Sequence, residues 1–323
     1  MNIESTGTND ADRKVMTVCG WIDPSELGIT DAHNHLWIEA VPGAQTGLPR
    51  LDDQAAILEE LLDYRQAGGG SIVDCQPSGC GRNAHKLQEL SKASGVHVIA
   101  STGFHRQHYY PPDFWLFQAS AAQACDLFMT AIGNSILEAT EIAESIRVGL
   151  IKVACEARLE DTPQTLLEAA AEACRLTGTA IAIHTEKGSQ AERILEFFKE
   201  RGIDPRRLVI CHIDKRPDAG LHMELAQEGA LLEYDTFYRP QYQPEKNVWP
   251  MLEKLIHNGL ASQIALATDM AEAELWSRLG KGPGLAGFVT VVRSRLKSME
   301  IPLPTIDRLT GGNIAERLAR PPS

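Results

Sequence analysis

Two histidines one residue apart close a short apolar stretch near the start of the chain. They are His33 and His35 in Thr30-Asp31-Ala32-His33-Asn34-His35-Leu36. In a β-strand, residues i and i+2 project from the same face, whereas on a helix these two side chains would point apart. The pair therefore indicates a strand end that grips a metal ion. The competing interpretation is ordinary, since a single histidine is more often a hydrogen-bonded or surface group than a ligand.

Four further residues with metal-site chemistry stand in or at the end of short apolar runs. Lys152 lies inside such a run, and His184, His212 and Asp269 each end one. Taken singly, either histidine can be a hydrogen-bonded strand-end group, and Asp269 can cap the following helix. A lysine ammonium within an apolar strand is costly to bury unless it is neutralised or modified. Histidine and aspartate are common metal ligands, so the combination favours one shared site.

The elements that would position these residues alternate along the chain. Apolar runs predict eight strands, at 29–36, 71–75, 97–102, 149–154, 180–185, 208–213, 230–234 and 264–269. Apolar residues at helical spacing predict helices at 52–66, 83–93, 135–146, 163–177, 190–201, 218–228, 246–258 and 288–299. This alternation predicts the α/β class with a parallel sheet covered on its outer face, as an eight-stranded (β/α)₈ TIM barrel. In such a barrel, reactive groups stand at the carboxyl ends of the strands.

Length and composition set limits on organisation and partners. We expect residues 1–323 to form a single barrel domain, with an N-terminal lead-in at 1–28 and an aromatic loop insertion at 104–122 over the barrel mouth. The net charge of −12 argues against nucleic acid and anionic membrane surfaces as partners, which leaves a small molecule. Seven scattered cysteines and a polar N-terminus without a signal pattern predict a cytoplasmic protein.

With these residues in place, the chain resembles the phosphotriesterase family of the amidohydrolase superfamily over nearly its whole length. The resemblance implies that His33, His35 and Asp269 bind the more buried metal and that His184 and His212 bind the second. It also implies a carbamate on Lys152 that bridges two divalent ions. Zn²⁺ fits these ligands, and Mn²⁺ or Co²⁺ are alternatives. The implied reaction is hydrolysis by a metal-bridging hydroxide, with Asp269 as the proton acceptor, in a family that often forms homodimers.

Cys75 departs from the family pattern, because it ends the second predicted strand, where the position faces the metals. A thiolate there would be an additional or bridging metal ligand, whereas a protonated Cys75 would be a small buried apolar group. If the thiolate closed the metal site against water, the barrel would be a binding protein without catalysis.

Three other segments resemble the lactonase branch of the family, namely Thr102-Gly103-Phe104-His105 with the aromatic loop after it, Tyr242-x-Pro244-Glu245, and Gly282-Pro283-Gly284-Leu285. This resemblance predicts that the enzyme opens a polar lactone or cleaves a carboxylic ester. Hydrolysis of phosphotriesters or other phosphoesters at the same site is the alternative. Acidic residues follow Asp269 where the sugar-lactone relatives hold a phosphate, so we expect no required phosphate on the substrate. The candidate substrate contacts are His105, Arg106, Arg239, Tyr242 and Arg278.

Overall fold

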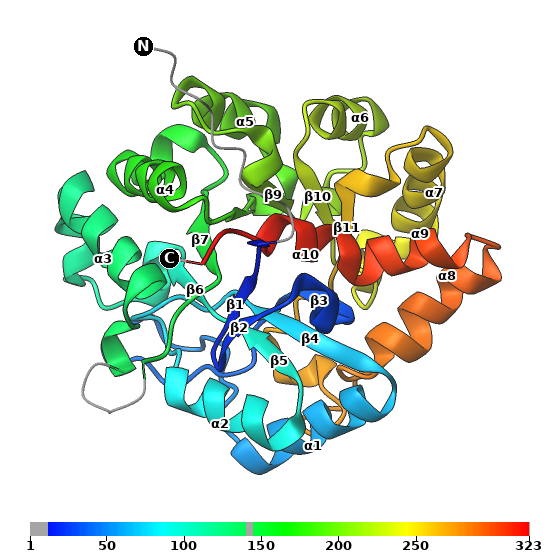
Figure 1. Ribbon diagram of the computed structural model, residues 1–323, viewed down its shortest axis with the longest axis horizontal. Helices are drawn as coiled ribbons and strands as arrows, with labels where there is room; N and C mark the ends of the chain where they lie inside the picture. Colours follow the sequence, from blue (N-terminus) through cyan, green and yellow to red (C-terminus); the bar gives the residue numbers. More distant parts are fainter. Residues whose placement is uncertain (1–11, 140–144, 323) are drawn as a thin grey trace.

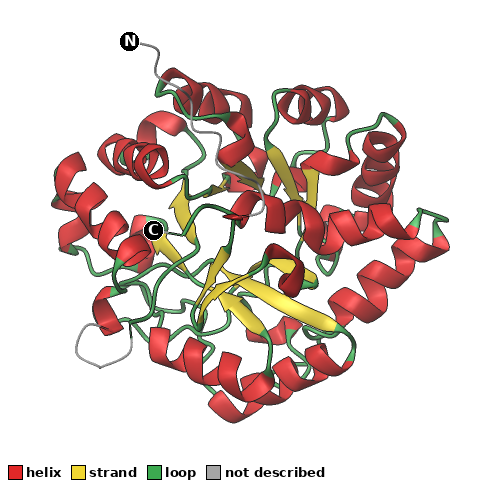
Figure 2. Cartoon of the chain, viewed as in Figure 1, coloured by secondary structure: helices red, strands yellow, loops and turns green. Residues whose placement is uncertain are grey.

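The computed structural model of this protein describes residues 12–139 and 145–322 and forms a barrel of parallel strands inside a ring of helices (Figures 1 and 2). All eight predicted strands are present, and the third is divided into two short strands at Ala100. The strands are β3 (Ile29–Asn34), β4 (Gly69–Asp74), β5 (His97–Ile99), β6 (Ser101–Gly103), β7 (Leu150–Ala154), β8 (Ile181–His184), β9 (Leu208–Cys211), β10 (Leu231–Tyr234) and β11 (Ile264–Leu266). The predicted fold class is therefore confirmed.

The sheet closes at two seams. Strands β3 to β5 pair in chain order and so do β6 to β11, and the chain passes directly from β5 to β6. At the other seam, between β3 and β11, the backbone N–H of Asp269 donates to the carbonyl of His33 at 3.0 Å. The buried carboxylate of Asp31 also accepts from the backbone N–H of Thr268 at 3.1 Å. These bonds bring the end of β3, with its two histidines, beside the segment that carries Asp269.

The helices of the described residues lie around the outside of the barrel, as the periodicity predicts, except the last, which lies across one end (Figures 1 and 2). They are α1 (Gln54–Gln66), α2 (Ala84–Ser94), α3 (Ala121–Gly133), α4 (Gln164–Thr177), α5 (Ala191–Glu200), α6 (Ala219–Gln227), α7 (Pro244–His257), α8 (Ser294–Ser298), α9 (Leu303–Asp307) and α10 (Asn313–Leu318). A π-helical turn at Phe288–Arg293 precedes α8 and completes the predicted helix at 288–299. Within the described residues, every helix is too short or too polar to cross a membrane.

The prediction of a helix at 135–146 is wrong for its described part. The helix after β6 is α3, whose first turn is set by a capping box in which Ser120 accepts from the backbone N–H of Gln123. After α3 the chain turns, forms a short 3₁₀ segment at Leu137–Ala139, and continues into residues 140–144, which lie outside the described part. The apolar residues at 135–146 that suggested a helix include Ile136 and Ile146, which are both buried in the core.

The amino-terminal end of the barrel is closed by elements that the sequence did not predict. Strands β1 (Val15–Thr17) and β2 (Gly20–Ile22) form an antiparallel hairpin within the expected lead-in. Val15 from this hairpin and Ile314 and Leu318 from α10 pack into one apolar cluster with the barrel interior, including Leu150 and Ala265. Because this end is filled by side chains, the open mouth lies at the carboxyl ends of the strands.

The aromatic segment after β6 is folded and borders this mouth. Gly103 makes the turn possible, because it has φ +105° and a Cβ there would lie 1.8 Å from the carbonyl oxygen of Lys152. The ring of Tyr110 packs against Phe114 and Phe117 at centroid distances of 4.8 and 5.0 Å. The Tyr110 hydroxyl accepts a hydrogen bond from the backbone N–H of His105 at 2.9 Å. The segment is therefore tied back to the end of β6 and holds His105 in place.

Candidate metal centre

The six residues singled out in the sequence as metal ligands converge at the carboxyl end of the barrel. The ring of His33 lies 5.5 Å from that of His35 and 4.9 Å from that of His212, and the rings of His184 and His212 are 4.6 Å apart. Lys152 Nζ is 3.1 Å from His33 Nε2. Asp269 Oδ1 is 3.6 Å from His35 Nε2. Five strands thus contribute to one cluster.

Three of the histidines are each oriented by a hydrogen bond from Nδ1. His33 Nδ1 donates to Glu233 Oε1 at 2.8 Å, and His212 Nδ1 donates to Asp235 Oδ2 at 2.5 Å. His35 Nδ1 donates to the amide oxygen of Gln76 at 2.6 Å. An oxygen at Nδ1 fixes the proton there and leaves the lone pair of Nε2 for another partner. This is the arrangement in which proteins present histidine to a metal ion.

The fourth histidine has a buried nitrogen that lacks a partner. Within the described residues, His184 Nε2 forms no hydrogen bond, since its nearest carboxylate oxygen, Glu186 Oε2, is 3.7 Å away. An unpaired buried ring nitrogen is costly unless something absent from the protein completes it. Three groups of buried ligand atoms lie within 4.8 Å of one another, and they are drawn from His33, His35, His212, Glu233, Asp235 and Asp269. This donor set, rich in imidazole and carboxylate, fits a divalent transition metal.

All four rings are held in the state that binds metals. Burial lowers the pKa of His33 and of His35 to about 3, and burial also lowers the pKa of His184 and of His212. Since desolvation disfavours the imidazolium, these side chains are neutral at physiological pH and need not lose a proton before binding a cation.

Asp269 occupies a constrained position between the histidines and two basic residues. Its φ of +48° lies in the left-handed region, which non-glycine residues adopt uncommonly and which aspartate tolerates better than most. Oδ2 lies 3.4 Å from Arg239 Nη2 and 3.7 Å from Lys215 Nζ. Burial acts to raise the pKa of Asp269, but the positive charges of Arg239 and Lys215 outweigh it and hold the pKa well below its usual value. The carboxylate is therefore ionised and available as a ligand.

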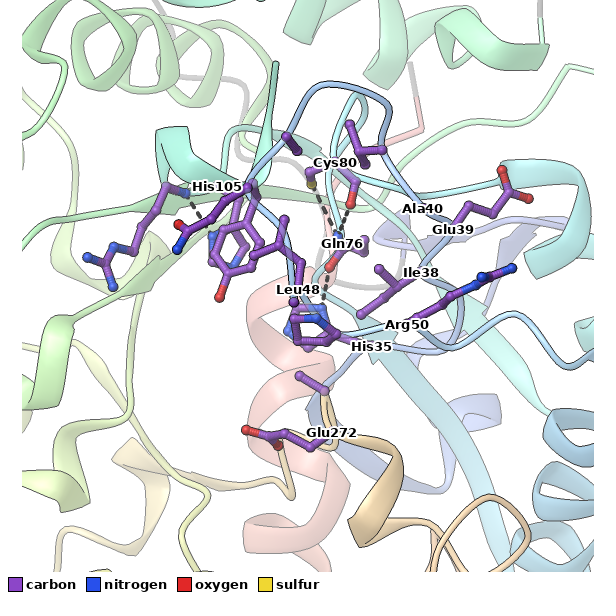
Figure 3. Close-up of a pocket in the computed structure, with 18 of the residues that line it drawn as sticks. His35, Ile38, Glu39, Ala40, Leu48, Arg50, Gln76, Cys80, His105 and Glu272 are labelled. Atoms are coloured by element: carbon purple, nitrogen blue, oxygen red, sulfur yellow. Dashed lines mark hydrogen bonds between the residues drawn. The ribbon is translucent and has the colours of Figure 1, made fainter. Parts of the chain in front are cut away.

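The mouth above this cluster is a cavity of about 580 Å³. The segment from Ile38 to Arg50, which follows β3, lines one side of it, and His105, Arg106 and Tyr109 line another. Figure 3 shows the Gln76 side chain between His35 and Cys80, with Glu272 on the opposite side of His35. A cavity of this size with convergent polar groups fits a small organic substrate.

The five candidate substrate contacts divide into two groups. His105 and Arg106 line the cavity, although Arg106 already pairs with Glu156 and Glu186 at 2.8 Å each. The other three are absent from the described lining. Arg239 donates to the carbonyls of Thr268 and Asp269, and the ring centre of Tyr242 is 5.7 Å from Lys215 Nζ.

Arg278 is not brought to the site. It stands at the surface, where its guanidinium pairs with Asp63 at 2.5 Å and with Glu59 at 3.3 Å on helix α1. Its prediction as a substrate contact fails because these helix carboxylates, distant in the sequence, bind it on the outside of the barrel.

Cys75 is fully buried at the carboxyl end of β4, but none of the groups of ligand atoms found in the described residues includes its thiol. It packs in the apolar interior cluster with Ala32 and Val73, and burial raises the pKa of its thiol. A role as a metal ligand stays a prediction.

Sequence reasoning missed the residues that orient the ligands. Glu233 and Asp235, at and just beyond β10, are fully buried, and Gln76 follows directly after Cys75. A signal was present for Glu233, because an ionisable residue between Leu232 and Tyr234 in an otherwise apolar strand is as costly to bury as Lys152. Lys215 was also missed. It lines the cavity three residues after His212.

The chain is similar to proteins of known family and known structure. The profile of the phosphotriesterase family matches residues 13–286. The N-acetyltaurine hydrolase of Mus musculus is 30% identical over 257 residues, which cover 69% of this chain and 72% of the relative. The crystal structure of an amidohydrolase from Mycoplasma synoviae is 25% identical and superposes with a TM-score of 0.87 over 95% of this chain and 92% of that one.

A further solved structure shares the fold. It is the lactonase Lmo2620 from Listeria monocytogenes, which is 23% identical and has a TM-score of 0.86 over 94% of this chain and 98% of its own. At that identity the likeness bears on the barrel alone.

Proposed function

This chain belongs to the phosphotriesterase family and is a metal-dependent hydrolase, and from that premise we propose that it cleaves small carboxylic acid derivatives at a lactone, ester or amide carbonyl. The observation that carries the proposal is the shared orientation of His33, His35 and His212, each with Nδ1 bound to an oxygen and Nε2 left for a metal. The cavity above them has polar side chains beside apolar ones, and its volume of about 580 Å³ supports a small substrate.

We assign the ligands in two groups. His33, His35 and Asp269 would hold the inner ion, and His184 and His212 would hold the outer one, since His184 Nε2 otherwise has no partner in the described structure. Lys152 Nζ faces His33 Nε2 at 3.1 Å from a fully buried position, where an ammonium would repel both cations. We therefore propose that Lys152 is carbamylated, which replaces the positive charge with anionic oxygen ligands. Zn²⁺ suits this set best, with Mn²⁺ or Co²⁺ as alternatives.

The residues around the cluster have distinct tasks in hydrolysis. Two divalent ions, when bound, supply a nucleophile at neutral pH by lowering the pKa of a water molecule and also polarise the scissile carbonyl. Asp269 accepts the proton of the attacking water on Oδ2, the oxygen that faces Arg239 and Lys215. Glu233 and Asp235 keep the proton of His33 and of His212 on Nδ1 throughout the cycle.

The type of bond that we propose is cleaved follows from the name of a relative and from the sequence. The relative from mouse is named for hydrolysis of N-acetyltaurine, a carboxamide, and our sequence interpretation favours lactones and carboxylic esters. Amides, lactones and carboxylic esters are all hydrolysed by attack of water at an acyl carbon, so a site that polarises a carbonyl can act on each of them. Phosphotriesters stay the alternative that the assay below decides.

The test combines metal depletion with a substrate panel. The protein is stripped with a chelator, refilled with Zn²⁺, Mn²⁺ or Co²⁺ in the presence of bicarbonate, and assayed on γ- and δ-lactones, carboxylic esters, N-acyl amides and paraoxon. We expect activity on at least one carbonyl substrate to vanish on stripping and to return on refilling. A paraoxon rate above every carbonyl rate would overturn the proposed substrate class.

A matched pair of variants separates metal binding from folding. His35→Asn removes a proposed ligand, whereas His222→Asn removes a fully buried histidine that contacts Tyr234 and two backbone carbonyls outside the site. We expect His35→Asn to lose metal and activity, and His222→Asn to lose thermal stability while it keeps its metal. Equal metal content in both variants would contradict the ligand assignment.

A further inference from the structure

One cationic side chain in the cavity has no hydrogen-bonded partner. Three cationic side chains line the cavity among the described residues, namely Arg50, Arg106 and Lys215. Arg50 donates to Asp52 at 2.5 Å, and Arg106 donates to Glu156 at 2.9 Å and to Glu186 at 2.8 Å. The ammonium of Lys215 forms no hydrogen bond with any residue in 12–139 or 145–322, although its backbone N–H donates to the carbonyl of His212. Its ammonium therefore has donors available for a group bound in the cavity.

The groups around Lys215 keep its ammonium charged but accept no hydrogen bond from it. Its side chain is only 11% exposed, and the nearest carboxylate oxygens are Asp269 Oδ2 at 3.7 Å and Asp235 Oδ1 at 3.8 Å. Burial acts to lower the pKa of Lys215, but these two carboxylates outweigh it and raise the pKa. A nearly buried ammonium without hydrogen bonds is costly, and a bound anion would supply them.

The carboxylates that line the cavity already have partners. Glu186 pairs with Arg106, Glu272 pairs with Arg239 at 2.9 Å, and Glu39 accepts hydrogen bonds from the side chains of Trp37 and Asn83. Asp269 is a proposed metal ligand, so its charge would be taken up by the ions. With those pairs complete, Lys215 is the cationic donor that an incoming anion meets beside the metal centre.

We propose that Lys215 binds an anionic group of the substrate, a carboxylate or a sulfonate, that lies within a few bonds of the scissile carbonyl. The proposal rests on the proposed function for the cleaved bond, and it adds the chemistry that selects the substrate. A short separation follows from the geometry, because the carboxylate of Asp269 lies 3.7 Å from Lys215 Nζ and 3.6 Å from His35 Nε2. The sequence had suggested Arg239 and Arg278 as cationic substrate contacts, but both are engaged elsewhere.

The kinetic test uses a charged substrate and a neutral one of the same shape. N-acetyltaurine and the analogue in which a methyl sulfone replaces its sulfonate are compared, followed by N-acyl amino acids with longer linkers. Lys215→Met should raise KM for the anionic substrate by about 10- to 100-fold, the loss expected for a charge-assisted hydrogen bond, and change kcat little. The KM for the neutral analogue should be unaffected, and Lys215→Arg, which keeps the positive charge beside Asp269, should restore part of the loss for the anionic substrate.

The control variant is Lys254→Met, which removes one exposed positive charge from helix α7 away from the cavity. It should leave both substrates unchanged. If Lys215→Met instead lowered kcat equally on the charged and neutral substrates, Lys215 would be a positioning residue for Asp269 and the proposal would be overturned. No effect on either substrate would overturn it as well.

A binding experiment separates this inference from the proposed function. Ethanesulfonate, propionate and ethyl methyl sulfone are titrated into the metal-loaded wild type and Lys215→Met by calorimetry. The two anions should bind the wild type at least about tenfold more tightly than the variant, and the neutral sulfone should show no difference. Anion binding that depends on Lys215 without turnover of any ester or amide would sustain the inference and refute the function. Turnover without such dependence would do the reverse.

Discussion

Glu233→Gln tests whether the buried carboxylate beneath His33 controls metal affinity. Glu233 is fully buried, and His33 Nδ1 donates to it at 2.8 Å. Loss of such an outer contact typically costs about 10- to 100-fold in metal affinity, or about 1.4 to 2.8 kcal/mol. Because glutamine keeps an acceptor for His33 and loses only the charge, we expect about a 10-fold weaker site for Glu233→Gln. Glu233→Ala removes the acceptor and should approach about 100-fold.

The assay is a competition for Zn²⁺ between the protein and a fluorescent chelator of known affinity, with thermal unfolding measured in parallel. Glu60→Gln is the matched control, because Glu60 is also a buried carboxylate but accepts from the backbone N–H groups of Arg278 and Leu285 at 2.6 and 3.0 Å, outside the metal centre. We expect Glu60→Gln to lose stability while its Zn²⁺ affinity stays within about twofold of the wild type. An unchanged affinity in Glu233→Gln, or an equal loss in Glu60→Gln, would refute the reasoning.

Three further variants test other parts of the site. Lys152→Met should reduce the metal content from about two ions per chain to about one or fewer, while Lys152→Glu, which supplies a carboxylate, should retain more, as measured by elemental analysis; equal contents would argue against a bridging anion. Cys75→Ala should keep its metal and lose about 1 kcal/mol of unfolding free energy, because the thiol packs as a small apolar group; metal loss would restore Cys75 as a ligand. Arg278→Ala should leave kcat/KM unchanged on every substrate, since its partners are on helix α1, and a specific rise in KM would return it to the site.

The sequence predicts the barrel well because its signals are local. Each strand is a short apolar run, and helices such as α4 begin after turn residues and end at a glycine, Gly178, which adopts φ +69°. The sequence prediction missed helix α3 because two local signals conflict at its start. The capping box at Ser120 marks the first turn of the helix, but the predicted aromatic loop extended to residue 122. The β1–β2 hairpin was not predicted because its strands have three residues each.

The residues of the candidate site also divide into those with a local sequence signal and those without one. His33, His35 and Lys152 could be found because their types are unusual in apolar strands, and the topology then brings strand ends together. Whether a charged side chain is free or engaged depends on partners far away in the sequence. Arg278 is bound by residues more than 200 positions earlier, whereas the ammonium of Lys215 lies 3.7 Å from Asp269 without a hydrogen bond to any described residue, so neither outcome could be foreseen from spacing.

The most direct test of the account is a crystal structure of the protein grown with Zn²⁺ and bicarbonate, with anomalous data collected at the zinc edge. We predict two anomalous peaks at the carboxyl end of the barrel. One should lie about 2.0 to 2.1 Å from His33 Nε2 and His35 Nε2, and the other at the same distance from nitrogens of His184 and His212. Density for a carbamate should extend from Lys152 Nζ. The absence of anomalous peaks at these histidines, or peaks only elsewhere on the molecule, would contradict the metal centre on which the proposed function rests.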